Sequence, residues 1–191
     1  MHYDKKTIPL KNGKSARLRA PREEDAGAML DFIRRAARET DYLALTPAET
    51  DAYTVESEAD FLRDPIRSPN KLMIVAEVDG RVAGNCQLIF LCSGKTRHRA
   101  AVMIGLLREF WGLGIGSAMF AEMERVARER GGIRQLELEV IEGNERAQDG
   151  IYRYGGASRR VPPVGRQQPC GDFHEKGAGV RCGKTNGYKS R

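Results

Sequence analysis

Apolar residues recur along this chain with two periods, and each period predicts a different kind of element. Alternation or short apolar runs indicate β-strands, whereas apolar residues spaced three and four apart indicate amphipathic helices. Strands are predicted at residues 15–21, 72–78, 82–91, 102–107 and 133–143. Helices are predicted at residues 22–39, 54–65, 117–130 and 144–156. The predicted order is therefore β α α β β β α β α, an α/β (α+β) arrangement in which helices cover a sheet.

The clearest of these elements is a hairpin. Its two apolar strands, residues 72–78 and 82–91, meet at Asp79-Gly80, a dipeptide that favours the tight turn between antiparallel strands. The helix at 54–65 is predicted to end at Pro65, because proline lacks the backbone N–H of a helix interior. The helix at 144–156 begins at Asn144, a residue type preferred at the N-cap.

Glycines at positions 112, 114 and 116 stand between the strand at residues 102–107 and the helix that follows. Strand, glycine turn and helix in this order place several backbone N–H groups at a helix N-terminus. Because the helix dipole is positive there, the turn is suited to an anion such as a pyrophosphate. The spacing G-x-G-x-G differs from the dinucleotide-binding G-x-G-x-x-G, and no Lys-Ser or Lys-Thr pair follows as in a P-loop. A corner whose glycines only permit close packing would give the same pattern.

The hairpin that leads directly into strand, G-x-G-x-G turn and helix resembles the GNAT superfamily of N-acetyltransferases, over residues 15–156. The segments "ETDYL" at residues 39–43 and "RHRAAVMIGLL" at residues 97–107 also resemble a bacterial branch of this superfamily. The resemblance implies the GNAT fold, a central mixed, mostly antiparallel sheet flanked by helices. It further implies that acetyl-CoA is the co-substrate, that an acetyl group passes directly to a primary amine, and that no metal takes part.

The resemblance assigns the coenzyme to the glycine turn and to the end of the preceding strand. In the family this strand diverges from its neighbour, so that unpaired backbone groups bind the pantetheine arm and the thioester oxygen, while the turn binds the pyrophosphate. Trp111 stands where most members have glutamine or arginine, and Asn144 matches an asparagine at the opposite wall. The residues implied to bind acetyl-CoA are Leu106, Leu107, Arg108, Trp111, Gly112, Leu113, Gly114, Ile115, Gly116, Ser117 and Asn144.

Tyr152 is the candidate catalytic acid. Many family members carry a tyrosine after the asparagine that protonates the departing thiolate, and a phenol with a pKa of about 10 suits that step. Tyr152 follows an aliphatic residue as the family motif requires, but it stands one position later, and a structural role in the last helix would explain it equally well. Water, Glu77 and His98 are the alternatives for the general base, and none of them is favoured.

The net charge of +6 lies entirely in the C-terminal segment. Residues 157–191 hold eight basic residues and two acids, so the rest of the chain has 24 of each sign. A neutral body does not favour nucleic-acid binding, although a basic tail that binds RNA or an acidic surface remains an alternative. No apolar run reaches the length of a membrane span. With no apolar leader and no C-x-x-C pair, we expect a cytoplasmic protein without membrane attachment and with reduced cysteines.

Residues 157–191 contain no Leu, Ile or Met and follow neither period, so we expect a poorly ordered tail rich in Gly, Pro and Arg. Family members continue with two strands, which would be missing or altered here, and a reading-frame shift between codons 148 and 156 is one hypothesis for the change. The expected parts are an N-terminal extension at 1–14, an acetyltransferase domain at 15–156 and the tail. An uncovered sheet edge could pair with a second copy, which leaves a homodimer open.

Two functions remain open from the sequence. The first is an N-acetyltransferase that acts on a small-molecule, N-terminal or lysine amine. The second is a catalytically weak protein that uses the same fold to bind acyl-CoA or a partner. In this fold the loop at residues 40–54 sets the substrate, and here it contains Tyr42, Tyr53 and three acids. An acidic lining would suit a cationic amine, but surface loops commonly carry such residues.

Overall fold

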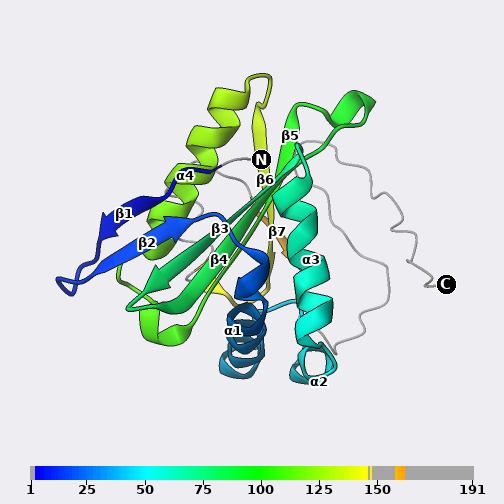
Figure 1. Ribbon diagram of the computed structural model, residues 1–191. Coiled ribbons are helices and arrows are strands. Elements are labelled where there is room, and N and C mark those ends of the chain that lie inside the picture. The colour runs from blue at the N-terminus through cyan, green and yellow to red at the C-terminus, as the bar shows by residue number, and fades with distance from the viewer. Residues whose placement is uncertain (1–2, 146, 148–157, 162–191) are drawn as a thin grey trace.

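A mixed sheet of seven strands forms the centre of the computed structural model, which describes residues 3–145, 147 and 158–161 (Figure 1). The strands lie side by side in chain order. Neighbours from β1 to β5 pair antiparallel, whereas β5 with β6 and β6 with β7 pair parallel. The predicted mixed, mostly antiparallel sheet is therefore confirmed. The strands are β1 Lys6–Pro9, β2 Ser15–Arg19, β3 Lys71–Val78, β4 Arg81–Phe90, β5 Arg99–Leu106, β6 Gln135–Ile141 and β7 Ser158–Val161.

The predicted hairpin joins β3 to β4 through a two-residue turn. Val78 pairs with Arg81, and Asp79 and Gly80 between them have φ angles of 49° and 75°. Positive φ at both central positions is typical of the hairpin turn that matches the twist of the strands, and Asp-Gly favours it. Most side chains of β3 are buried because helices cover one face of this central strand and the other face also packs into the core.

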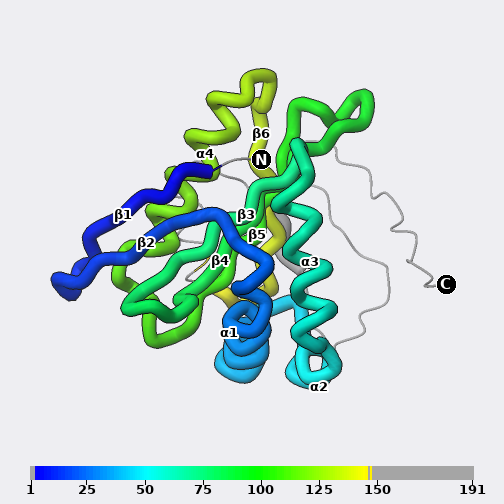
Figure 2. Tube along the Cα trace, in the orientation of Figure 1, coloured from blue at the N-terminus to red at the C-terminus, as the bar shows by residue number. Residues whose placement is uncertain are grey.

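Helices lie on both faces of the sheet (Figures 1 and 2). A Cβ atom added to Gly105 would face Phe32 of α1, whereas the side chain of the next residue, Leu106, faces Gly116 of α4. Because successive strand residues point to opposite faces, α1 and α4 cover opposite faces. The helices are α1 Ala26–Glu39, α2 Pro47–Asp51, α3 Val55–Arg67 and α4 Ile115–Arg130, and the short 3-10 turns are η1 Glu23–Asp25, η2 Gly94–Thr96 and η3 Arg108–Phe110.

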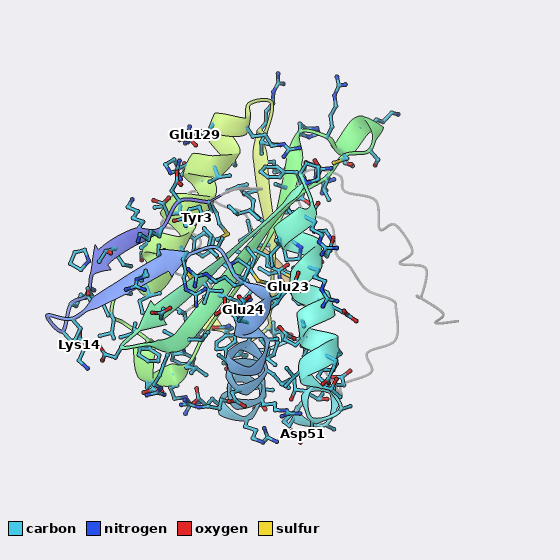
Figure 3. The ribbon with its side chains drawn as sticks, in the orientation of Figure 1. Tyr3, Lys14, Glu23, Glu24, Asp51 and Glu129 are labelled. Carbon is cyan, nitrogen blue, oxygen red and sulfur yellow. The ribbon has the colours of Figure 1, made fainter. Side chains whose placement is uncertain are left out.

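The helices bury the faces that the sequence periodicity predicts. In α4, Met119, Met123 and Ala127 are buried and Val126 is half-buried. At the other side of the sheet, α1 and α2 are joined by an ion pair of 2.5 Å between Arg38 and Asp51, and Figure 3 labels Asp51 at the end of α2. This contact joins the end of α1 to Asp51, near the end of the loop at 40–54 that the family resemblance associates with the substrate.

Three short elements depart from the prediction. The N-terminal extension expected at 1–14 contains β1, which pairs with β2, and the tail expected at 157–191 contains β7, which pairs with β6. The predicted loop at 40–54 contains α2, which begins with a capping box between Thr46 and Glu49. These elements have four or five residues, too few to show a period.

The helix at 54–65 was predicted to end at Pro65, and this was wrong. The helix α3 continues to Arg67 with Pro65 buried inside it, and the Ser68 N–H donates to the Asp64 carbonyl at 2.8 Å. A proline close to the end of a helix removes one hydrogen bond, and the burial of its ring offsets part of that loss.

The last predicted helix lies mostly outside the described residues. Its beginning is confirmed, because the Asn144 side chain accepts a hydrogen bond from the Ala147 N–H at 3.2 Å, as an N-cap residue does. Residues 148–156, which include Tyr152 and the position of the proposed frame shift, are not described, and neither is the tail after Val161.

Candidate active site

The strands β5 and β6 stop pairing with each other soon after they begin. Their parallel pairing covers only Arg99 with Gln135, Ala100 with Leu136, and Ala101 with Glu137. Beyond that point β6 pairs with β7, from Leu138 to Ile141. The rest of β5 therefore has no paired strand on its β6 side within the part of the chain that the structure describes. This opening is the divergence that the family resemblance implies, and it is called the β5–β6 gap below.

The backbone of β5 directs alternate peptide groups into the β5–β6 gap. The Leu107 N–H donates to the Ala83 carbonyl at 3.0 Å, and the Arg99 carbonyl accepts from the Leu91 N–H at 3.1 Å. Residues with odd numbers therefore bond to β4, and the peptide groups of the even-numbered residues point the other way. Leu106, the last of these residues, thus turns its N–H toward the gap at the position predicted for the thioester.

The glycine turn lies at the end of the same strand. Gly112 and Gly114 have φ angles of 77° and 98°, and Gly114 is the N-cap of α4. The Ala118 N–H donates to the Gly114 carbonyl at 3.0 Å, so the amides of the first turn precede the first hydrogen bond of the helix. A Cβ on Gly116 would lie 3.3 Å from Leu106 Cδ1, which shows how closely this turn packs on β5. The glycines therefore serve packing and also expose amides that favour an anion.

Several groups predicted to hold the coenzyme arm already have partners. The Trp111 indole Nε1–H donates to the Leu106 carbonyl at 2.8 Å, and the Arg108 N–H donates to Glu39 Oε2 at 2.7 Å. The Arg108 guanidinium also donates to the Glu39 carbonyl and lies 5.5 Å from the Trp111 ring centroid. Of the three residues predicted at the strand end, the Leu106 N–H is the amide directed into the gap.

An ion cluster holds η3 in place beside this strand end. Glu109 accepts hydrogen bonds from Arg35 at 2.8 Å and from Arg81 at 2.7 Å. The Arg35 guanidinium is the main cause of a pKa of Glu109 below its ordinary value, and Arg81 adds to it. A cavity of about 430 Å³ lies next to the cluster, between α1 and the start of β4, and Leu107 forms part of its wall. The carboxylate therefore stays charged and ties α1, β4 and η3 together.

The opposite wall of the gap brings Asn144 and the loop after α1 together. Because β5 and β6 run parallel, the end of β6 and Asn144 lie at the same end of the sheet as the glycine turn (Figure 1). A Cβ on Gly143 would lie 3.5 Å from the Tyr42 hydroxyl. Tyr42, which is 42% exposed, thus places the predicted substrate loop against the end of β6.

The comparisons with known proteins decide the family. The model of the Acetyltransferase (GNAT) family matches residues 33–155. The chain belongs to the GNAT family. GNAT enzymes use acetyl-CoA, which agrees with the coenzyme expected from the sequence. No protein of curated function matches the chain in sequence.

Solved GNAT structures share this fold. A GNAT-family acetyltransferase from Streptococcus pneumoniae is 26% identical, with 73% of this chain and 83% of that chain covered and a TM-score of 0.67. A ribosomal-protein-alanine N-acetyltransferase from Brucella melitensis is 24% identical, with 72% and 82% covered and a TM-score of 0.61. The PaiA N-acetyltransferase from Thermoplasma acidophilum, solved with coenzyme A, is 17% identical, with 73% and 87% covered and a TM-score of 0.61.

In this GNAT protein neither of the two residues weighed as general base lies at the gap. Glu77 is on β3, with β4 between it and β5, and it accepts a hydrogen bond from Arg19 at 2.9 Å. His98 precedes β5, at the end of the strand opposite Leu106. Glu39 is a carboxylate that accepts a hydrogen bond from the backbone at the strand end, and it is the first residue of the "ETDYL" segment, whose resemblance to the family was the only sequence signal for it.

Among the described residues of this GNAT chain, neither a metal cluster nor a membrane-spanning helix is found. No group of three or more His, Cys, Asp or Glu side chains among the described residues could hold a metal ion. In the same part of the chain, every helix is too short or too polar to cross a membrane.

Proposed function

We propose that this chain is an N-acetyltransferase that moves the acetyl group of acetyl-CoA to a primary amine by direct transfer. One observation carries the proposal. The β5–β6 gap opens directly beside the glycine turn at the start of α4. A thioester arm that lies along β5 would thus end in a diphosphate at the helix N-terminus, where anions are favoured. A similar GNAT structure, the PaiA enzyme, was solved with coenzyme A.

Each step of the transfer has a candidate group in this chain. The Leu106 N–H would donate to the thioester oxygen, and an amide aimed at a developing oxyanion contributes about 3–4 kcal/mol. The amine nitrogen attacks the thioester carbonyl, the C–S bond breaks, and the thiolate leaves. Tyr152 would supply the proton that the thiolate takes, and water would accept the proton that the amine loses. The turn from Gly112 to Ser117 would bind the diphosphate, and Asn144 would form part of the opposite wall of the gap.

The second candidate function is a catalytically weak acyl-CoA-binding protein. It is favoured by the hydrogen bonds at the strand end. The Arg108 N–H already donates to Glu39, and the Leu106 carbonyl already accepts from the Trp111 indole. A ligand that displaced these partners would lose part of the free energy that its own hydrogen bonds provide. Weak binding of the arm with retained binding of the diphosphate would then be expected.

The two functions separate in one set of measurements. Coenzyme A raises the melting temperature under either function, since a ligand of the native state stabilises it. Only the enzyme releases free thiol from acetyl-CoA when small amines, peptide N-termini and lysine peptides are added. Tyr152→Phe should lower thiol release while it leaves the thermal shift unchanged, and Tyr154→Phe, two residues away, is the matched control. A folded protein that gives no thermal shift with coenzyme A would rule out both functions.

A further inference from the structure

A basic hollow lies at the opposite end of the sheet from the β5–β6 gap. It has a volume of about 610 Å³ and lies between the loop that precedes β5 and the loop that connects α4 to β6. Figure 1 shows these two loops side by side beyond the starts of β5 and β6. The lining residues with basic side chains are Lys95, Arg97, His98 and Arg134, and no acid among the described residues lines the hollow.

The cations of this hollow differ from most others in the protein. Most described arginines form ion pairs, as Arg19, Arg35 and Arg125 do. No ion pair within the described residues involves Lys95, Arg97 or Arg134, and all three are exposed. The nearest acid along β6, Glu137, is bound by Arg99 and by Gln135, so it is already engaged. In the part of the chain that the structure describes, several like charges thus converge without a counter-charge, which favours an anion.

The backbone around the hollow is both open and well fixed. Gly94, Gly131 and Gly132 form the rest of its wall, and a Cβ added to any of them would meet no atom within 4 Å. The two loops are joined by hydrogen bonds from the Arg134 and Gln135 N–H groups to the His98 carbonyl, at 2.8 and 3.2 Å. Long cationic side chains therefore surround an unobstructed space on loops that hold each other in position.

We propose that this hollow binds a ligand that carries at least two phosphate groups. Guanidinium groups bind phosphate oxygens through paired hydrogen bonds, and lysine adds a point charge. Two arginines and one lysine carry three positive charges, which exceeds the single negative charge of one carboxylate. The phosphates could belong to a small polyphosphate or to the backbone of single-stranded RNA, and the test below separates these sources. The proposal does not depend on acetyl transfer, because the hollow lies at the opposite end of the sheet from Leu106.

Binding to the full chain is measured with two probes, inorganic tripolyphosphate by calorimetry and a labelled single-stranded oligouridine by fluorescence anisotropy. Saturating coenzyme A is present, so that phosphates cannot report binding at the glycine turn. The triple variant Lys95→Ala/Arg97→Ala/Arg134→Ala removes the unpaired cations. The control Lys5→Ala/Arg17→Ala/Arg67→Ala removes the same charge from exposed residues just before β1, on β2 and on α3. The melting temperature of the triple variant should not fall, because these side chains form no ion pair with any described residue.

We expect the triple variant to lose tenfold or more in affinity, whereas the control stays within about twofold. With RNA, the slope of log affinity against log salt should become shallower by roughly two, since each contact to a single-stranded phosphate contributes about 0.7. Binding of tripolyphosphate identifies a small polyphosphate, and binding of RNA alone identifies a nucleic acid. The proposal is overturned if the wild-type chain binds neither probe. It is also overturned if both triple variants lose affinity equally, because net charge alone would then explain the binding.

Discussion

Replacement of Gly84 by alanine tests the geometry of the candidate site most directly. Gly84 on β4 is paired with Leu106 on β5. A Cβ at this position would lie 2.4 Å from the Gly105 carbonyl oxygen, 2.4 Å from Leu106 Cδ2 and 3.1 Å from Leu106 Cα. Ordinary contacts begin at 3.4 Å, so the two strands would have to separate by about 1 Å. The displacement falls on the strand end that is proposed to hold the thioester.

The expected cost follows from this overlap. Overpacking of a core typically destabilises a protein by about 1–3 kcal/mol. For a chain of this size, each kcal/mol lowers the melting temperature by roughly 2–4 °C, so Gly84→Ala should lower it by about 2–12 °C. A shift of about 1 Å at a reacting centre can reduce turnover roughly 100-fold. Thiol release should therefore fall far more than the stability loss explains.

Gly105→Ala is the matched control. It makes the same substitution on the neighbouring strand residue, but its Cβ would meet nothing closer than Phe32 Cζ at 3.6 Å and Asn85 Oδ1 at 3.9 Å. Both variants are compared by thermal melting, by titration with coenzyme A and by thiol release. Gly105→Ala should stay close to the wild type in all three. If the two variants lose stability and coenzyme affinity to the same extent, the close approach of β4 and β5 is not what the site depends on.

Further predictions concern the glycine turn and a partly buried ion cluster. Gly114→Ala, at a φ of 98°, should lower the free energy of unfolding by about 1–2 kcal/mol, measured by denaturant unfolding. Gly116→Ala should lower it by less, because only Leu106 Cδ1 must move to make room for the new Cβ. Arg19→Met should cost about 3–5 kcal/mol in the same melts, because it leaves Asp25 and Glu77 without their shared partner; a loss below about 1 kcal/mol would contradict this. Burial tends to raise the pKa of Asp25, but the Arg19 guanidinium and the Arg22 N–H outweigh it and hold that pKa below its ordinary value. This contribution to stability is therefore complete above the pKa of the unfolded chain and is lost as the pH falls through the folded value, so acid should destabilise the wild type more steeply than Arg19→Met.

Much of the fold could be predicted because its main elements are long and periodic. The β3–β4 hairpin follows from two apolar runs around Asp79-Gly80, and α4 follows from the spacing of Met119, Met123 and Ala127. The strand β1 escaped prediction because only one of its four side chains is buried, so no alternation is visible. The helix α2 is held by a local cap and not by an apolar face, and that signal was present at Thr46 and Glu49.

The candidate site divides in the same way. The glycine turn could be located because its backbone needs positive φ at Gly112 and Gly114, and glycine is the residue type that adopts positive φ most readily. The contact of Glu39 with the Arg108 N–H joins residues 69 positions apart, and no local pattern marks it. The basic hollow could not be predicted for a related reason. Outside the tail the sequence has equal numbers of basic and acidic residues, and it cannot show which cations have no acid close to them in the fold.

The hydrogen bond between the Trp111 indole and the Leu106 carbonyl gives this protein an optical reporter. Trp111 is the only tryptophan in the chain, and its ring nitrogen touches the last residue of β5. A ligand that enters beside that carbonyl alters the polarity around the indole and with it the wavelength of emission. Occupancy of the gap can thus be followed in unmodified protein, without a dye and without turnover.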